Sequence, residues 1–322
     1  MIVSKDNING IFAAVGNTKL LRLDRIFPES GLEIYAKLEN LNPGGSFKDR
    51  SSINIIQKAI NLGKITKNTV IIESTSGNMG VGLAQACLYF GLKLILVIDP
   101  LINPHTEKLL VTFGARLIRV KQKDDSGSYL MSRLDKVKSL VKQEPNSFWT
   151  NQYENNSNPE AQRLIARELL DQMDNKLDYL FVGTGTGGTI MGCLREIQYR
   201  GLETIVVPVD VMGSKIFDAP KGNKKIPGIG AGQKSNFILP EYLHLPVYVD
   251  DRESVMGCRK LLQREAILAG GSTGAVVAAI SKMRCHLRKN SKIAFLISDS
   301  GERYLTTIYD NDWVYKNLKL AL

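Results

Sequence analysis

Residues 70–99 read VIIESTSGNMGVGLAQACLYFGLKLILVID, and their pattern indicates the class of fold. Two apolar runs, 70–72 and 94–98, have the composition and length of buried strands, and segment 80–89 between them has the apolar spacing of a helix. A strand, a helix and a second strand in this order predict parallel strands joined by a helical crossover. The stretch therefore indicates an α/β protein.

The same alternation continues in both directions along the chain. Further strands are predicted at 34–38, 117–120, 179–182, 205–209, 247–249 and 293–297. Further helices are predicted at 51–61, 107–113, 129–141, 159–173, 190–199, 254–268 and 275–287. We therefore expect an α/β fold of two three-layer domains with mainly parallel sheets.

Two polar stretches interrupt the alternation. Residues 151–159, NQYENNSNP, predict a boundary between domains, and a chain of 322 residues is long enough for two domains of roughly 150 residues each. Residues 213–236 are rich in Gly, Pro and Lys and predict a long loop. Long loops in compact enzymes often carry function.

The chain carries a formal net charge of +10. The cations are scattered over predicted helical faces, as at Lys136, Lys138 and Lys142, and are not gathered in a basic arm with interleaved aromatic residues. We therefore expect no nucleic-acid partner. The excess positive charge suits anionic substrates or cofactors.

The cysteines and the first residues bear on the cellular environment. The four cysteines have neither the spacing of a zinc site nor that of a disulfide framework, which predicts a reducing compartment and no metal. The start, MIVSKDNING, lacks a basic-then-apolar signal pattern, and no run reaches the roughly 18 apolar residues of a membrane span. We expect a cytoplasmic protein without membrane association.

In an open α/β sheet, ligands bind where strands give way to loops at their carboxyl ends. One junction, NPGGSFKDR at 42–50, places two glycines and a helix-capping Ser46 ahead of Lys48, in the first turn of a helix. The amino end of a helix carries partial positive charge, which favours the neutral amine needed to form a Schiff base. Lys48 is therefore a candidate catalytic residue, and the alternative is a surface lysine after a glycine turn.

Three further junctions offer polar groups at helix starts. Residues 73–80, ESTSGNMG, present donors suited to a carboxylate or a phenolic oxygen. Residues 183–189, GTGTGGT, predict a backbone cradle for a phosphate, and they also satisfy the G-x-G-x-x-G pattern of dinucleotide sites, with Asp210 as a candidate ribose acceptor. Residues 270–275, GGSTGA, place a hydroxyl pair at a fourth helix start. Ordinary helix capping is the alternative for each.

One cofactor uses all four junctions. Pyridoxal phosphate needs a lysine for its aldehyde, a cradle for its phosphate, a donor for its ring oxygen and a partner for its pyridine nitrogen. The chain resembles, over nearly its whole length, the cysteine synthase and cystathionine β-synthase family, which is the tryptophan-synthase-β-like class (fold type II) of pyridoxal enzymes. The motifs that carry the resemblance are NPGGSFKDR, ESTSGNMG, GTGGT at 185–189, GIGAG at 228–232, GGSTGA and GERYL at 301–305.

The resemblance implies a role for each matching residue. Lys48 would bind the cofactor covalently and move the α-proton, Asn78 would contact the ring oxygen, and Ser272 would face the pyridine nitrogen. The cofactor phosphate would lie against Gly185, Thr186, Gly187, Gly188 and Thr189. The substrate carboxylate would lie against Thr75, Ser76, Gly77 and Gln152, with the loop from Gly228 to Gly232 closing over it.

Within the family, the chain looks most similar to the branch that makes the precursor of 2,3-diaminopropionate, known from siderophore biosynthesis, by joining O-phospho-L-serine to L-glutamate. Arg133 matches the arginine that reads the substrate phosphate in that branch, and a guanidinium is a bidentate ligand of fixed charge. Tyr153 also matches the branch, whereas cysteine synthases usually carry Phe there. The other similar stretches are ESTSGN, Asp99-Pro100, GSYLMSR at 127–133, NQY at 151–153, GCRKLL at 257–262 and ERYLTTIYDNDW at 302–313.

Some positions depart from the branch. Gly185 stands where the branch has Ser and is the residue of cysteine synthases, so a cysteine synthase that uses sulfide with O-acetylserine or O-phosphoserine is the alternative. Gln162, segment 165–168 and Lys19 also differ from the usual residues. A nicotinamide dehydrogenase built on the glycine run would leave the lysine without a role, and a catalytically silent relative would not need the complete cofactor shell.

The resemblance also implies a homodimer of two-domain subunits. A smaller, mobile N-terminal domain would comprise residues 1–12 and 36–152, and a larger domain that binds the cofactor phosphate would comprise 13–35 and 153–322.

Overall fold

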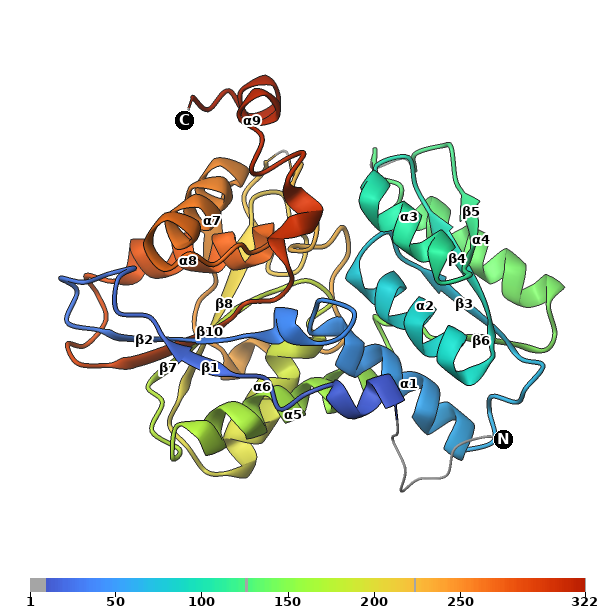
Figure 1. Ribbon diagram of the computed structural model, residues 1–322, viewed down its shortest axis with the longest axis horizontal. Helices are drawn as coiled ribbons and strands as arrows, with labels where there is room; N and C mark the ends of the chain where they lie inside the picture. The colour runs from blue at the N-terminus through green and yellow to red at the C-terminus, as the bar shows by residue number, and fades with distance from the viewer. Residues whose placement is uncertain (1–9, 125–126, 223, 322) are drawn as a thin grey trace. The chain divides into compact units, whose positions relative to one another are not determined.

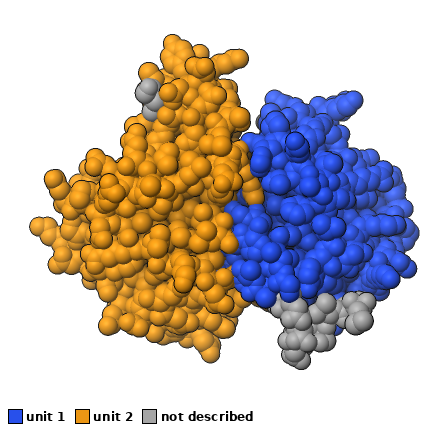
Figure 2. Space-filling model, in the orientation of Figure 1, with its two compact units in different colours: residues 1–15, 42–158 blue, residues 16–41, 159–322 orange. Residues whose placement is uncertain are grey.

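A computed structural model describes residues 10–124, 127–222 and 224–321. The chain divides into two compact units, of which unit 1 comprises residues 1–15 and 42–158 and unit 2 comprises 16–41 and 159–322 (Figure 2). Residues 1–9, which belong to the predicted first domain and to the stretch without a signal pattern, lie outside the described residues. The predicted mobility of the smaller domain stays a prediction.

Unit 1 is built on a parallel sheet of four strands. The strands are β3 (Val70–Ser74), β4 (Lys93–Ile98), β5 (Arg116–Arg119) and β6 (Ser147–Trp149), in the order β5-β4-β3-β6. Its helices are α1 (Lys48–Asn61), α2 (Asn78–Phe90), α3 (Pro104–Thr112) and α4 (Leu130–Gln143), preceded by the 3₁₀ turn η1 (Gly10–Ala14).

The strands of unit 1 are apolar on both faces because helices cover both. Ile71 belongs to a hydrophobic cluster with residues of α1, α2 and α3. Its neighbours Val70 and Ile72 point the other way, into a cluster with Val137 of α4. Successive side chains on a strand alternate between faces, so this run buries both faces of the sheet and produces three layers.

Unit 2 is built on a sheet of six strands in the order β1-β2-β10-β7-β8-β9, with β1 antiparallel to β2 and the other pairs parallel. Helices α7 and α8 cover one face, and α5 and α6 lie on the other (Figure 1). The strands are β1 (Leu20–Arg22), β2 (Glu33–Lys37), β7 (Tyr179–Gly183), β8 (Ile205–Val211), β9 (Val247–Val249) and β10 (Lys292–Leu296). The helices are α5 (Ser157–Gln172), α6 (Gly188–Tyr199), α7 (Asp251–Glu265), α8 (Gly271–Met283) and α9 (Asn311–Leu318), with the 3₁₀ turns η2 (Glu39–Leu41), η3 (Pro240–Tyr242) and η4 (Gly301–Tyr304).

Two of the departing positions have packing roles in unit 2. Glu168 pairs with the fully buried ammonium of Lys37 (Oε2 to Nζ, 2.9 Å), which also donates to the Thr18 carbonyl (2.8 Å). Gln162 is buried and accepts from the hydroxyl of Thr189 (3.5 Å). A buried lysine needs a counter-ion, so Glu168 stabilises the packing of α5 on β2.

The predicted three-layer α/β architecture is confirmed. Among the strands and α-helices of the described residues, β1, β6 and α9 were not predicted, and neither were the 3₁₀ turns. The predicted cap of α1 was wrong in detail, because Phe47 occupies the capping position and the Ser46 hydroxyl accepts from the Lys48 N–H (3.3 Å). No helix within the described ranges combines the length and the apolar character needed to cross a bilayer.

Candidate active site

The predicted Schiff-base lysine begins the first helix of unit 1. The turn ahead of it is closed by a hydrogen bond from the Gly45 N–H to the Asn42 carbonyl (2.7 Å). Gly44 approaches the Asp49 carboxylate so closely that a Cβ would lie 2.5 Å from its oxygen, and the Gly44 N–H donates to that carboxylate. The carboxylate of the first helical turn thus fixes the glycine turn against α1 and determines where Lys48 starts the helix.

The amine of Lys48 is shifted toward its neutral form. Burial lowers the pKa of the Lys48 ammonium from 10.5 to about 8. The partial positive charge at the start of α1 acts in the same direction. The neutral amine is the nucleophile that a Schiff base requires, so the environment of Lys48 suits the role predicted for it.

A buried carboxylate ties the end of β3 to the segment after β6. Glu73 accepts from the N–H groups of Ser74 (2.7 Å) and Gln152 (3.2 Å) and from the hydroxyl of Thr150 (2.5 Å). Burial raises the pKa of Glu73, and these hydrogen bonds oppose the rise. The side chain of Gln152 donates to the Ser74 carbonyl (3.4 Å), so Gln152 lies beside the loop that carries residues 75–77.

That loop leads directly into α2. The Thr75 hydroxyl accepts from the N–H of Gly77 (3.3 Å), and Gly77 is the extended residue ahead of Asn78, the first residue of the helix. The first N–H groups of a helix have no partner inside the helix and attract anions. The structure therefore brings Thr75, Ser76, Gly77 and Gln152 to one edge of the sheet, with donors suited to the predicted substrate carboxylate.

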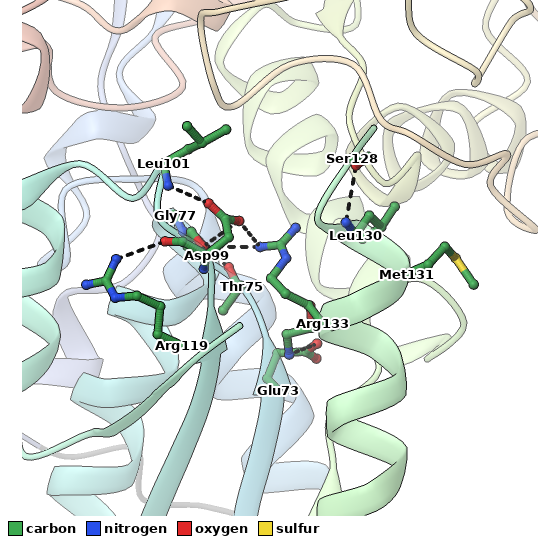
Figure 3. Close-up of polar contacts among 12 residues, drawn as sticks. Glu73, Thr75, Gly77, Asp99, Leu101, Arg119, Ser128, Leu130, Met131 and Arg133 are labelled. Atoms are coloured by element: carbon green, nitrogen blue, oxygen red, sulfur yellow. Dashed lines mark hydrogen bonds and ion pairs between the residues drawn. The ribbon is translucent and has the colours of Figure 1, made fainter. Parts of the chain in front are cut away.

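Arg133 of α4 joins this edge (Figure 3). Its Nη1 donates to the Ser76 hydroxyl (3.1 Å) and lies 3.2 Å from Oδ2 of Asp99, the residue after β4. The Ser76 hydroxyl in turn donates to the same Asp99 oxygen (3.2 Å). Within residues 10–124, 127–222 and 224–321, the buried Nε–H of Arg133 finds no acceptor. The guanidinium is thus held at one nitrogen and can bind an oxyanion with the rest.

Tyr153 follows Gln152 in the same segment. Burial raises the pKa of the Tyr153 phenol, while the positive charge of Arg133 lowers it by a smaller amount. The phenol therefore stays protonated at neutral pH and can donate a hydrogen bond.

In unit 2, the glycine run connects β7 to α6. Gly187 adopts φ +84°, and a Cβ there would meet the Ser235 hydroxyl at 2.7 Å, so this position requires glycine. At Gly185, by contrast, the nearest atom to an added Cβ is the Gly228 carbonyl oxygen, 3.9 Å away. The cradle therefore has open space at Gly185 and presents the amino end of α6, an arrangement that suits a phosphate.

The predicted closing loop lies along this cradle. The Gly230 N–H donates to the Thr184 carbonyl (2.7 Å), and the Lys224 ammonium donates to the carbonyls of Ile229 (2.6 Å) and Gly230 (3.0 Å). The structure thus brings the loop from Gly228 and the glycine run together within unit 2.

Ser272 lies beside the same cradle. It is the second residue of α8, it is buried, and its carbonyl oxygen would lie 3.5 Å from a Cβ at Gly183, where β7 ends. A hydroxyl can either donate to or accept from a pyridine nitrogen. Unit 2 therefore combines the predicted phosphate cradle with the predicted ring partner.

These donor sets fit pyridoxal phosphate. Unit 1 supplies an amine of lowered pKa and an amide at a helix start, and unit 2 supplies a backbone cradle and a neighbouring hydroxyl. Lys48 and Asn78 would hold the aldehyde carbon and the ring oxygen, residues 185–189 the phosphate, and Ser272 the ring nitrogen. These assignments stay predictions.

Two acidic residues that organise the site had no role in the sequence analysis. Glu73 is the penultimate residue of β3 and Asp99 follows β4, and each fixes a neighbouring loop or side chain. Both could have been found as acidic residues at the carboxyl ends of buried parallel strands, where polar side chains of a site gather.

Residues 11–299 match the family of pyridoxal-phosphate dependent enzymes, and the chain belongs to this family. Its cofactor is pyridoxal phosphate, its fold is the predicted tryptophan-synthase-β-like fold type II, and it is a β-substituting enzyme. The dehydrogenase alternative was wrong.

The relatives agree with this assignment. The chain is 39% identical, over 94% of its length and 90% of the relative, to the N-(2-amino-2-carboxyethyl)-L-glutamate synthase of Ralstonia nicotianae. Among solved structures, it is similar to a hydrogen sulfide-producing enzyme of Fusobacterium nucleatum (TM-score 0.85, 34% identity, 93% of this chain and 100% of that one). It is also similar to the O-acetylserine dependent cystathionine β-synthase of Helicobacter pylori (TM-score 0.86, 31% identity, 94% and 99%).

Proposed function

We propose that the protein joins O-phospho-L-serine to L-glutamate and releases N-(2-amino-2-carboxyethyl)-L-glutamate and inorganic phosphate. The observation that carries the proposal is Arg133, whose guanidinium is held by Ser76 at the edge where the substrate carboxylate is predicted to bind. The relative of Ralstonia nicotianae with that synthase activity supports the same reaction. An acetyl leaving group would give the arginine no phosphate to bind.

The chain's own residues would perform the reaction as follows. The loop 75–77 and Gln152 bind the carboxylate of O-phospho-L-serine, and the neutral amine of Lys48 takes the proton from Cα. Bound pyridoxal phosphate supplies an electron sink for the pair left at Cα. Arg133 stabilises the phosphate as the Cβ–O bond breaks.

The second half of the reaction adds the amine. The amino nitrogen of L-glutamate forms a bond to Cβ and loses a proton to solvent, and Lys48 returns the proton to Cα. The protonated phenol of Tyr153 would hydrogen-bond the incoming substrate. The product is a precursor of 2,3-diaminopropionate.

A second candidate function is a cysteine synthase that uses sulfide. Gly185, which is the residue of cysteine synthases, favours it. An added Cβ at this position would have open space, so packing does not explain why glycine replaces the Ser of the diaminopropionate branch. Tyr153 and Arg133 favour the glutamate reaction. We further expect from the resemblance a cytoplasmic homodimer that serves siderophore biosynthesis or a related pathway.

The phosphate assignment is tested by Arg133→Ala, compared with wild type for O-phospho-L-serine and for O-acetyl-L-serine. Loss of a charge-assisted bidentate contact should lower kcat/KM for the phosphate substrate by roughly 100-fold and change that for the acetyl substrate by less than about threefold. Arg133→Lys should restore part of the activity, because it keeps the charge but not the fork geometry. Equal losses for both substrates would show that Arg133 does not read the phosphate.

A further inference from the structure

Both oxygens of the Asp99 carboxylate have partners. Its Oδ1 accepts from the Leu101 N–H (2.9 Å), and its Oδ2 accepts from the Ser76 hydroxyl and pairs with Arg133, both at 3.2 Å (Figure 3). Its main-chain carbonyl accepts from Nη1 of Arg119 (3.2 Å), which is itself paired with Glu107. The side chains of Asp99 and Arg133 are only 10% and 16% exposed, so little solvent screens the pair.

Asp99 contacts Arg133 at a single nitrogen. Among the described residues, Nη1 contacts both the Ser76 hydroxyl and the Asp99 carboxylate. The remaining edge consists of Nε–H and Nη2–H, which point in parallel and match two oxygens of one phosphate. Nε–H is buried and has no acceptor in the part of the chain that the structure describes. Asp99 therefore determines which edge of Arg133 is presented.

We propose that Asp99 is a positioning residue for phosphate recognition: it holds Nη1 of Arg133 so that the Nε–Nη2 edge receives the phosphate of the substrate. This inference rests on the proposed function, in which Arg133 binds that phosphate. A guanidinium on a flexible side chain must be ordered before it can make two parallel hydrogen bonds, and Asp99 does this before substrate binds. The Ser76 hydroxyl, which bridges the two groups, links this cluster to the carboxylate loop.

The test substitutes Asp99→Asn. The amide keeps an oxygen for the Leu101 N–H and nearly the same volume, but its NH₂ group cannot accept from Arg133. KM for O-phospho-L-serine should rise roughly tenfold, with kcat within about twofold, because one charge-assisted contact is lost. KM for O-acetyl-L-serine should stay within about twofold of wild type, and inorganic phosphate should bind the cofactor-loaded protein about tenfold more weakly by calorimetry.

Asp135→Asn is the matched control. Asp135 lies on α4, is exposed and pairs with Lys138, so this variant removes one carboxylate charge without touching Arg133. It should leave both KM values unchanged. If Asp99→Asn does not fold, Arg119→Gln replaces it. Arg119 is 37% exposed, pairs with Glu107 and donates to the Asp99 main-chain carbonyl but not to the Asp99 carboxylate, so a two- to threefold rise in KM for the phosphate substrate alone is expected.

The Arg133→Ala background separates the two proposals. If Asp99 acts through Arg133, adding Asp99→Asn to Arg133→Ala should change nothing further. An additional loss there, or an equal rise in KM for both substrates, would overturn the role of Asp99. If Arg133→Ala abolishes the preference for phosphate while Asp99→Asn preserves it, only this inference fails. If Arg133→Ala itself has no effect on that preference, the proposed function fails.

Discussion

Raising the pH should increase the rate at which the apoprotein takes up pyridoxal phosphate, because only the neutral amine of Lys48 attacks the aldehyde. With a pKa of about 8, about one Lys48 amine in ten is neutral at pH 7, against fewer than about one in a thousand for a lysine of pKa 10.5. Uptake should therefore rise with pH, reach half its maximum near pH 8 and level off above about pH 9.

The uptake is followed by the absorbance of the protein-bound cofactor after mixing with apoprotein over a pH series. N-acetyl-lysine amide mixed with the cofactor under the same conditions corrects for the titration of the cofactor itself. Lys48→Ala provides the baseline, since it can bind the cofactor only without a covalent bond. A half-maximal rate at pH 10 or above would refute the reasoning, because it would mean that burial does not lower the pKa of Lys48.

The same pKa shift has a consequence for stability whose sign can be worked out. Between about pH 8 and 10.5, the unfolded chain keeps the Lys48 proton that the folded apoprotein has released. The free energy of unfolding should therefore rise with pH through this window. Below about pH 8 both states keep the proton, and the folded state carries the full cost of the buried charge. Lys48→Met, which keeps an unbranched side chain one atom shorter and removes the charge, should remove the rise in urea titrations.

Two further substitutions test the surroundings of the site. Thr150→Val removes a donor to the buried Glu73 carboxylate and should lower the free energy of unfolding, measured with urea, by about 2 kcal/mol. Thr204→Val removes a bond to the neutral Leu177 carbonyl and should lower it by about 1 kcal/mol. A larger loss for Thr204→Val would contradict the account of Glu73. Gly185→Ser should fold as well as wild type, because the Cβ of the new serine has room. It should also increase the yield of the glutamate adduct relative to cysteine. A drop in Tm of several degrees would show that the space is not open.

The alternation of strands and helices could be predicted because both faces of each central strand are buried, which makes the strands continuous apolar runs. Ile71 and Ile72 face opposite layers, and the sequence pattern reflects both. The edge elements escaped prediction for the opposite reason. Strand β1 is mostly exposed and three residues long, so its residues carry no periodic signal and its pairing with β2 depends on tertiary structure.

The residues of the site were predictable as motifs, but their partners were not. Lys48 and the glycine run follow from loop composition and helix starts, which are local features of the sequence. Ser76 and Arg133 are 57 residues apart, and their contact depends on the packing of α4 against the ends of β3 and β4. The pairing of Asp99 with that arginine is a tertiary contact of the same kind, so its positioning role emerged only from the structure.

The central claim is tested most directly by identifying products. The purified, cofactor-loaded protein is incubated with O-phospho-L-serine and either L-glutamate or sulfide, with O-acetyl-L-serine in parallel, and the products are identified by mass spectrometry. The account predicts N-(2-amino-2-carboxyethyl)-L-glutamate from O-phospho-L-serine and L-glutamate, formed faster than from the acetyl substrate. Cysteine from sulfide, with no glutamate adduct from either donor, would contradict it and identify a cysteine synthase.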